Sequence, residues 1–596
     1  MSVLVLIGVL GGLGIGSTGA TEQEVNPCSV IFGDGSSGVG VLNRTFNGVP
    51  YCEYLGIRYA EPPVGQLRFK SPFLRVPRGL ENYTKVGNIC AQLDTLEVAT
   101  NVLGDEDCLF LNVYSPAIPK GSEPNRKYPV LVYIHGGSYA IWSSQTDMFG
   151  VDLLIENEVV IVSFNYRLFV LGFLRHPDFN VSGNFGLKDQ LSALQWVQQF
   201  IEPFGGDPSN VTIIGQSVGA HSVTYHLYLE PFSGLFHRAI VMSGSLLAPS
   251  AMIYEPERFT PKYLKAINIS TKEQLMNAPF QDLFLRFPQH RRFVFASIGL
   301  PIFLPTVEDV SDPAALVTKP AHELILSEPI NQVPLMIGMT AAEFVPYFSS
   351  SQQFSADENF PNRDKGKSLT LVLNMLRTAN VLTKRIDPNG AGRHFYGKFG
   401  DLANMYYPVK KLLSQLHEHG PYQAPIYHYR FEFDGKFGKY KNQYYKEDLD
   451  MSYGGAMHGD DLGYLFSPYN LREALANRSE FETEWKVAEI NVEQIGNFVK
   501  YGNPTPNYSE RVTVLWQPFN GNNSVPQYMN INVENEMRKD DDSSNLVFRL
   551  WKKAHNCLFY YECLPVQDLH HRMAQLLELN RTDVNLEGIF DDDNIT

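Results

Sequence analysis

The chain has 596 residues, of which 44% are hydrophobic, and its formal net charge at pH 7 is −15. The length allows several domains or one large one, and the composition is that of an ordinary globular protein. An acidic protein is repelled by nucleic acids and anionic membrane surfaces, so the charge argues against both as partners. Because no linker, repeat or low-complexity block interrupts residues 30–565, we expect residues 21–596 to form a single domain.

Residues 1–20 predict a secretory signal peptide. An apolar run at residues 3–10 is followed by small residues that suit signal peptidase, and the segment is too short for a comfortable membrane span. Asn-x-Ser/Thr sequons occur at Asn43, Asn82, Asn180, Asn210, Asn268, Asn477, Asn507, Asn522, Asn580 and Asn594. The last residues carry no apolar tail for an anchor. We therefore expect a secreted, N-glycosylated protein without a membrane anchor.

Six cysteines permit 15 disulfide connectivities. They fall into three pairs that are local in sequence: Cys28 with Cys52, Cys90 with Cys108, and Cys557 with Cys563. The second pair would close a surface loop. No Cys-x-x-Cys motif and no Cys/His cluster with zinc spacing occurs, so we expect no metal ion.

Residues 211–220 predict a strand, a tight turn and a helix. They contain the pattern Gly-x-Ser-x-Gly, in which Gly215 and Gly219 leave room for a turn that pushes the hydroxyl of Ser217 out of the sheet. The pattern also occurs by chance, and a surface serine in a glycine turn is the alternative interpretation. Apolar residues at helical spacing in residues 187–201 complete an α/β succession and favour a nucleophile.

Other short apolar runs bounded by turn residues predict further strands, at residues 128–134, 159–164, 238–244 and 334–338. Their alternation with helical segments predicts an α/β fold with a large, mostly parallel sheet covered by helices on both faces. Two Gly-x-Gly-x-x-Gly matches, beginning at Gly14 and Gly33, do not open an amphipathic helix, so we expect no dinucleotide cofactor.

The first of these strands ends at His135, which two glycines follow. Backbone N–H groups bared by consecutive glycines can point at one spot and hold a negatively charged oxygen, although a plain turn is the alternative.

A serine hydroxyl needs a histidine as base, and the histidine needs a carboxylate that fixes its tautomer. Among 15 histidines, His458 lies in a glycine-rich loop from which an imidazole can reach the turn at Ser217; His135 and His428 remain open as alternatives. Glu343 follows a predicted strand end, where catalytic residues of open α/β sheets project, and an exposed loop glutamate is its alternative interpretation.

In combination, these segments resemble the type-B carboxylesterase and cholinesterase group of α/β-hydrolases, across roughly residues 28–560. The segments that carry the resemblance are residues 59–65, 106–113, 135–137, 165–167, 183–190, 204–208 and 215–220, and His458 with Asp460. The resemblance implies the α/β-hydrolase fold, with Ser217 as nucleophile, Glu343 as the acid and His458 as the base.

The resemblance also implies an oxyanion hole. Its donors would be the backbone N–H groups of Gly137, Ser138 and Val218, with Gly136 shaping the turn. The family pattern further favours a disulfide between Cys90 and Cys108.

Four positions depart from the family pattern. Ser138 stands where a third glycine is common and Val218 where alanine is usual, so both crowd the oxyanion hole without removing a donor. Phe344 stands where glycine often follows the acid. Gln216 replaces the glutamate that most relatives carry beside the nucleophile, as in the juvenile hormone esterases of insects, and removes one negative charge near the substrate.

We therefore expect a secreted serine carboxylesterase that needs no cofactor and hydrolyses small uncharged, hydrophobic esters through an acyl-enzyme. The 38 Phe and 31 Tyr residues make an apolar gorge plausible. A catalytically inactive, cholinesterase-like adhesion or binding protein is one alternative. A cholinesterase is another, although the segment between Cys90 and Cys108 has no Trp to hold a quaternary ammonium. The natural ester and the oligomeric state stay open.

Overall fold

The computed structural model describes residues 26–94, 101–117, 126–145, 149–284, 303–343, 401–418, 422–438, 455–468, 471–520, 526–540 and 546–560. The predicted signal peptide, Phe344, Cys563 and the sequons at Asn522, Asn580 and Asn594 lie outside these ranges, so the predictions about them, including the Cys557–Cys563 pair, stay predictions.

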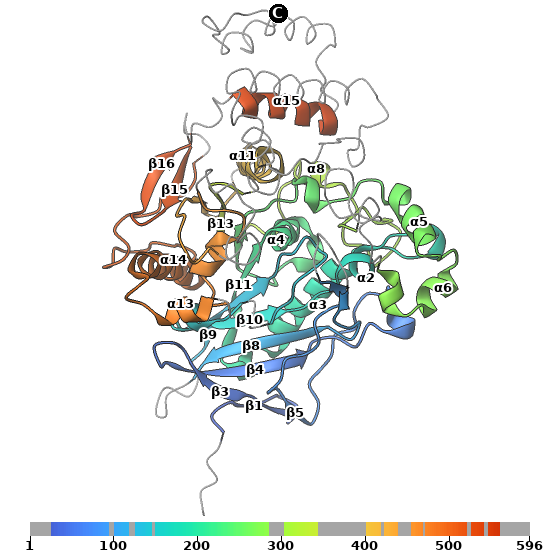
Figure 1. Cartoon of the computed structure of the whole chain (residues 1–596), viewed down its shortest axis with the longest axis horizontal. Coiled ribbons are helices and arrows are strands. Elements are labelled where there is room, and N and C mark those ends of the chain that lie inside the picture. The colour runs from blue at the N-terminus through green and yellow to red at the C-terminus, as the bar shows by residue number, and fades with distance from the viewer. Residues whose placement is uncertain are drawn as a thin grey trace, which may run out of the picture.

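An eleven-stranded sheet forms the centre of the molecule (Figure 1). In spatial order its strands are β16 (Glu536–Lys539), β15 (Gln527–Ile531), β14 (Ile426–Phe431), β13 (Leu335–Thr340), β12 (Arg238–Met242), β11 (Gly206–Gln216), β9 (Tyr128–Ile134), β10 (Val160–Phe164), β8 (Phe110–Pro116), β4 (Pro50–Arg58) and β3 (Val41–Arg44). The strands from β15 to β10 pair in parallel, and those at both edges pair antiparallel. The prediction of a large, mostly parallel sheet is confirmed.

Smaller sheets and helices surround it. A three-stranded sheet contains β1 (Ser29–Ile31), β2 (Ser37–Val39) and β5 (Leu80–Asn82), and β6 (Gln92–Leu93) pairs with β7 (Val102–Leu103). The α-helices are α1 (Asp152–Ile155), α2 (Phe169–Phe173), α3 (Phe185–Phe200), α4 (Val218–Tyr228), α5 (Pro256–Ala266), α6 (Lys272–Asn277), α8 (Ala321–Leu324), α11 (Tyr407–Glu418), α13 (Arg472–Ala476), α14 (Glu482–Tyr501) and α15 (Leu546–Tyr560).

Strand β9 shows why the sheet is covered on both faces. Its side chains alternate between two hydrophobic clusters, because successive residues of a strand point to opposite sides. Val130 and Val132 belong to the cluster that contains α3 and α4, whereas Leu131 and Tyr133 belong to the cluster that contains α1 and α14. In Figure 1, α3 and α14 lie on opposite sides of the central strands. A strand that is buried on both faces reads as one uninterrupted apolar run, which is how residues 128–134 read.

Two disulfides link the N-terminal segments. Cys28 bonds Cys52 in β4, and Cys90 bonds Cys108, with Cα–Cα distances of 5.4 and 4.8 Å. The structure thus contains the Cys90–Cys108 bond that the resemblance favours, and it pairs Cys28 with Cys52, which the sequence had left open.

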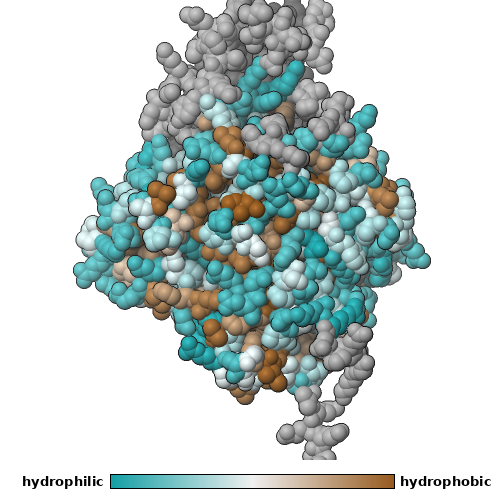
Figure 2. All heavy atoms as spheres, turned by 180° about the vertical axis from the view of Figure 1, so that it is seen from behind, coloured by the Kyte–Doolittle hydropathy of each residue, from teal (hydrophilic) through white to brown (hydrophobic). Residues whose placement is uncertain are grey.

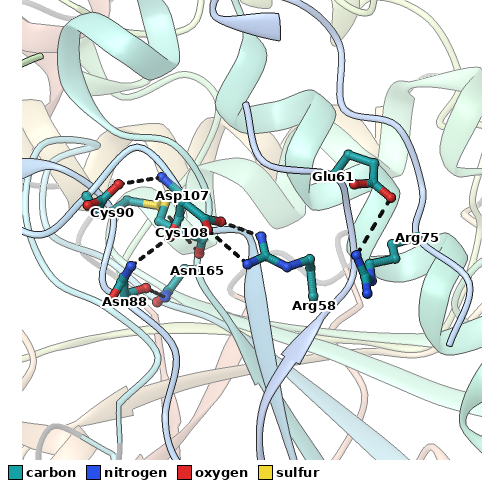
Figure 3. A network of polar contacts seen from close by, with 9 residues as sticks. Arg58, Glu61, Arg75, Asn88, Cys90, Asp107, Cys108 and Asn165 are labelled. Atoms are coloured by element: carbon teal, nitrogen blue, oxygen red, sulfur yellow. Dashed lines mark hydrogen bonds and ion pairs between the residues drawn. A yellow bond between two sulfur atoms is a disulfide. The ribbon is translucent and has the colours of Figure 1, made fainter. Parts of the chain in front are cut away.

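A polar network holds the second disulfide in place (Figure 3). Arg58 forms an ion pair with Asp107, next to Cys108, and Asn88 donates to the Asp107 carbonyl at 3.2 Å. Asn165, which follows β10, donates to the Asn88 carbonyl at 2.9 Å. The disulfide segment is thereby tied to the end of a central strand.

On the face opposite to that of Figure 1, hydrophobic side chains form separate patches among hydrophilic ones (Figure 2). Across the described ranges, none of the helices combines the length and apolarity needed to cross a membrane. The same ranges contain no group of three or more His, Cys, Asp or Glu side chains arranged to hold a metal ion.

Candidate active site

The turn at Ser217 joins β11 to α4. Ser217 has φ 59° and ψ −126°, a backbone conformation that a non-glycine residue rarely adopts. Its N–H donates to the Met242 carbonyl of β12 at 2.9 Å, which holds the strained residue in place. Ser217 is 8% exposed, so it lies at the edge of the core.

The two glycines of the motif are needed for space. A Cβ on Gly215 would lie 2.3 Å from the backbone of Gly219, and a Cβ on Gly219 would lie 2.1 Å from the Ile134 carbonyl oxygen. Any other residue at either position would push α4 away from the sheet. The physical reason inferred from the sequence is therefore the one found in the structure.

The carboxylate of Glu343 lies three residues beyond the end of β13, and the residue is 3% exposed. Its Oε1 accepts hydrogen bonds from the Thr340 N–H at 2.7 Å and from the Ser243 hydroxyl at 2.5 Å. Ser243 itself follows β12, and its N–H donates to the Gly338 carbonyl of β13. Two neighbouring strand ends thus fix one oxygen of the carboxylate and leave the other to a third partner.

That partner is His458. Its Nδ1 lies 2.5 Å from Glu343 Oε2, and its backbone N–H donates to the Glu343 carbonyl at 3.0 Å. The histidine precedes the 3₁₀-helix η11 (Asp460–Tyr464), and Asp460 accepts the Met457 N–H at 2.8 Å, which shapes the loop. Because Nδ1 faces a carboxylate it carries the proton, so Nε2 keeps its lone pair.

The Nε2 edge of His458 faces the turn at Ser217. It lies 3.2 Å from Nε2 of Gln216, the residue that immediately precedes Ser217. The structure therefore brings Glu343 and His458 into direct contact. It also places Nε2 of the imidazole beside Gln216, the residue that precedes the predicted nucleophile.

The loop after β9 lies against the same turn. A Cβ on Gly136 would lie 2.8 Å from the Gln216 carbonyl oxygen and 3.1 Å from Ser217 Cβ. Gly137 has φ 95° and Ser138 has φ 57°, so the backbone turns sharply there. Val218 is the first residue of α4, and a helix leaves its first N–H groups without intrahelical partners. The four residues predicted for an oxyanion hole therefore come from two segments that meet at Ser217.

The two alternative histidines lie elsewhere. His135 stacks on Tyr166 with ring centroids 4.4 Å apart, and its Nδ1 lies 2.9 Å from the Gly136 carbonyl. His428 is in the middle of β14, with Nδ1 3.0 Å from the Ile337 carbonyl and Nε2 3.8 Å from Asp540. Of the three histidines that the sequence left open, His458 is the one in contact with Glu343.

The charges around the pair follow from burial. Burial raises the pKa of Asp461 well above its usual range, and the carboxylates of Glu343 and Asp460 raise it further. Burial lowers the pKa of His221 in α4 to about 3, with His458 as the second cause. His221 is therefore uncharged at pH 7, the neutral form of Asp461 is favoured by its surroundings, and Glu343 is the carboxylate that contacts the imidazole.

Ser243 and Asp461 were not singled out from the sequence. For Ser243 a signal existed, because it directly follows a predicted strand and parallel strands end at one edge of a sheet. The walls of the predicted apolar gorge stay a prediction, since residues 344–400 and 439–454, which adjoin Glu343 and His458 in the chain, lie outside the described residues.

Comparison with known proteins shows the family to which the chain is similar. The profile of the Carboxylesterase family matches residues 39–549. The chain is 30% identical to a juvenile hormone esterase of Heliothis virescens, over 85% of this chain and 91% of that one, and 31% identical to Esterase E4 of Myzus persicae, over 82% and 88%. The crystal structure of juvenile hormone esterase from Manduca sexta, with OTFP covalently attached, superposes with a TM-score of 0.72 at 26% identity. The match covers 89% of this chain and 99% of that one.

Proposed function

The chain belongs to the carboxylesterase family, has the α/β-hydrolase fold and is a carboxylic ester hydrolase, and from this premise we propose that it cleaves small uncharged, hydrophobic esters with a triad of Ser217, His458 and Glu343. The observation that carries the proposal is the 2.5 Å contact between His458 Nδ1 and Glu343 Oε2, with Nε2 turned toward the segment that displays Ser217.

In the proposed reaction, His458 Nε2 takes the hydroxyl proton of Ser217 while Oγ attacks the ester carbonyl carbon. Glu343 stabilises the imidazolium that forms. Collapse of the tetrahedral intermediate breaks the bond to the alkoxy oxygen, which leaves as the alcohol with the proton from Nε2. Water then gives a proton to the same nitrogen and attacks the acyl carbon; the second tetrahedral intermediate breaks the bond to Ser217 Oγ, which takes the proton back from Nε2, and the carboxylic acid is released.

The oxyanion of both tetrahedral intermediates would be held by the N–H groups of Gly137, Ser138 and Val218. Removing one such donor raises the barrier by about 2.7–4 kcal/mol in comparable sites. Their convergence on Ser217 is supported by the close approach of Gly136 to Gln216 and Ser217.

The preference for uncharged substrates is supported by the groups around the triad. Gln216 is neutral by nature, His221 is uncharged at pH 7 because burial lowers its pKa to about 3, and burial raises the pKa of Asp461 and so favours its neutral form. The glutamine at position 216 therefore adds no negative charge that would attract a quaternary ammonium. The names of two relatives, both juvenile hormone esterases, fit an uncharged ester as substrate.

We also propose that the protein is secreted and N-glycosylated. Disulfides persist in oxidising compartments, and the structure contains two. The side chains that would carry glycans are exposed at Asn82, Asn180, Asn268, Asn477 and Asn507.

Hydrolysis of p-nitrophenyl acetate and of a longer acyl ester tests the proposal, with the purified protein, its Ser217→Ala variant and a Ser209→Ala control. Ser209 is an exposed serine of the same strand, β11, so its loss should leave activity unchanged. We expect activity in the parent and the control, none above background in Ser217→Ala, and covalent labelling by a fluorophosphonate that needs Ser217. Activity that survives Ser217→Ala would overturn the triad. A folded parent without activity or labelling would identify a binding protein.

A further inference from the structure

The side chain of Gln216 is completely buried at the end of β11. Its amide nitrogen lies 3.2 Å from His458 Nε2. Its Oε1 has no hydrogen-bond partner among the described residues, and it lies 2.8 Å from where a Cβ on Gly136 would be. The Gln216 amide therefore fits beside residue 136 because that residue is a glycine, which has no Cβ.

The contact has a defined direction. His458 Nδ1 faces Glu343 at 2.5 Å, so Nε2 carries the lone pair and the Gln216 amide N–H donates to it. The imidazole is thus held at both nitrogens, by an acid on one edge and by a neutral amide on the other. The amide touches the nitrogen that must exchange protons with Ser217 and the leaving group.

An amide suits both protonation states of the ring. In the resting ring it donates to the single Nε2 lone pair and yields that lone pair to the Ser217 hydroxyl during the attack; after proton transfer a turned amide can offer its oxygen to the Nε2–H. A carboxylate can only accept, so it would favour the protonated ring. The thioether of a methionine, which has the same length, cannot donate to Nε2 and is only a weak acceptor for an Nε2–H.

Among the described residues, five polar or ionisable side chains lie around the imidazole of His458. Glu343 comes from the end of β13, Gln216 from β11 and His221 from α4, while Asp460 and Asp461 lie in η11. His221 is uncharged at pH 7, burial raises the pKa of Asp461 and so favours its neutral form, and Asp460 accepts a hydrogen bond from the Met457 N–H. A carboxylate at position 216 would therefore be a second negative charge in direct contact with the imidazole.

We propose that Gln216 is a positioning residue for the general base: its amide holds the Nε2 edge of His458 at the nucleophile and, being neutral, keeps the base working further into the acid range than a glutamate there would. The inference rests on the proposed function of His458 and adds a determinant of its pH range.

The decisive variant is Gln216→Glu, which keeps the side-chain shape and adds a charge. The acid limb of its kcat/KM profile should move upward by about one pH unit or more, because an opposite charge at this distance favours the protonated ring by that amount. The matched control is Gln274→Glu, an exposed glutamine in a capping box at the start of α6 that glutamate also fulfils. Its profile should superpose on that of the parent.

A second variant, Gln216→Met, tests the inference if the Gln216→Glu protein does not fold. Methionine fills the same space without donating to Nε2. With the fold checked by circular dichroism, its kcat should fall about tenfold or more, its KM should stay within about threefold, and its acid limb should not move upward.

An unmoved acid limb in folded Gln216→Glu would overturn the inference, and so would a parental kcat in Gln216→Met. Either result with an activity that still requires Ser217 would leave the proposed function standing. Activity that survives Ser217→Ala would overturn both together.

Discussion

Two histidine–carboxylate pairs in this molecule contain the same chemical groups but differ in N···O distance and in the residues that contact the carboxylate. The pair of His458 and Glu343 lies beyond the end of β13, and its N···O distance is 2.5 Å. The pair of His428 and Asp540 lies at the middle of β14, and its N···O distance is 3.8 Å. Both histidines are more than 90% buried.

The third group in each pair makes the difference. Asp540 already forms an ion pair with Lys410, so its charge is committed to a cation. Burial, and after it the charge of Lys410, lowers the pKa of His428 to about 3. Glu343, in contrast, is held by neutral donors, Ser243 and Thr340, which orient it and leave its charge for the imidazole. We therefore expect a buried histidine beside a carboxylate to act as a base where no cation competes for the acid.

The largest expected effect is on kcat, and it distinguishes Glu343 from Asp540. Glu343→Gln should lower kcat by about 10³-fold or more, because the imidazole loses the group that fixes its tautomer and stabilises its cation. Asp540→Asn, the same carboxylate-to-amide change in the other pair, should leave kcat within about threefold. Ester hydrolysis at saturating substrate measures both.

The Asp540→Asn control should instead lower the free energy of unfolding by about 2 kcal/mol. This is less than the roughly 3–5 kcal/mol of a fully buried pair, because the Lys410 side chain keeps 16% of its surface exposed. Equal losses of kcat in the two variants would show that the comparison between the pairs is wrong.

The next effect concerns stability in acid. An unfolded histidine protonates near pH 6.5, whereas the folded pKa of His428 is about 3, so folding disfavours the proton. Its contribution is fully present above about pH 6.5 and is lost as the pH falls toward 3. By linkage this amounts to about 2 kcal/mol between pH 7.5 and pH 5.

Urea unfolding at pH 7.5 and pH 5 measures that loss. His428→Gln should lose about 2 kcal/mol less than the parent between the two values. His226→Gln should behave in the same way, since burial lowers the pKa of His226 to about 3 as well. If the variants lose as much unfolding free energy as the parent between pH 7.5 and pH 5, other groups cause the acid sensitivity.

The smallest effect tests the orientation of Glu343. Ser243→Ala removes the hydroxyl donor to Oε1 and leaves the Thr340 N–H, so kcat/KM should fall about tenfold. The control is Ser192→Ala in α3, where a buried hydroxyl has no partner among the described residues and no tie to the site. A parental rate in Ser243→Ala would mean that the backbone alone orients the acid.

Several features of the fold were predictable because their causes are local. The turn at Ser217 follows from two glycines whose replacement would cause contacts of 2.1 and 2.3 Å. Strand β9 has the bounds expected from its apolar run, and α3 (Phe185–Phe200) nearly matches the helical spacing of residues 187–201. The two disulfides join cysteines only 24 and 18 residues apart.

The predicted strand ends were less accurate. Strand β11 begins at Gly206, five residues before the apolar run, and β13 continues to Thr340, two residues past the glycine that appeared to end it. Pairing with neighbouring strands extends a strand beyond its own apolar pattern, and the sequence of one strand does not contain that information.

By itself, then, the sequence determined the elbow that displays Ser217, the alternation of strands and helices, and a short set of candidates for base and acid. Only the tertiary structure decided which histidine meets which carboxylate. His458 is 115 residues from Glu343 and 242 residues from Gln216, and they meet because β13, β12 and β11 are neighbours in the sheet. Contacts between distant segments depend on strand order and on burial, which cooperative packing of the whole core establishes and no local pattern records.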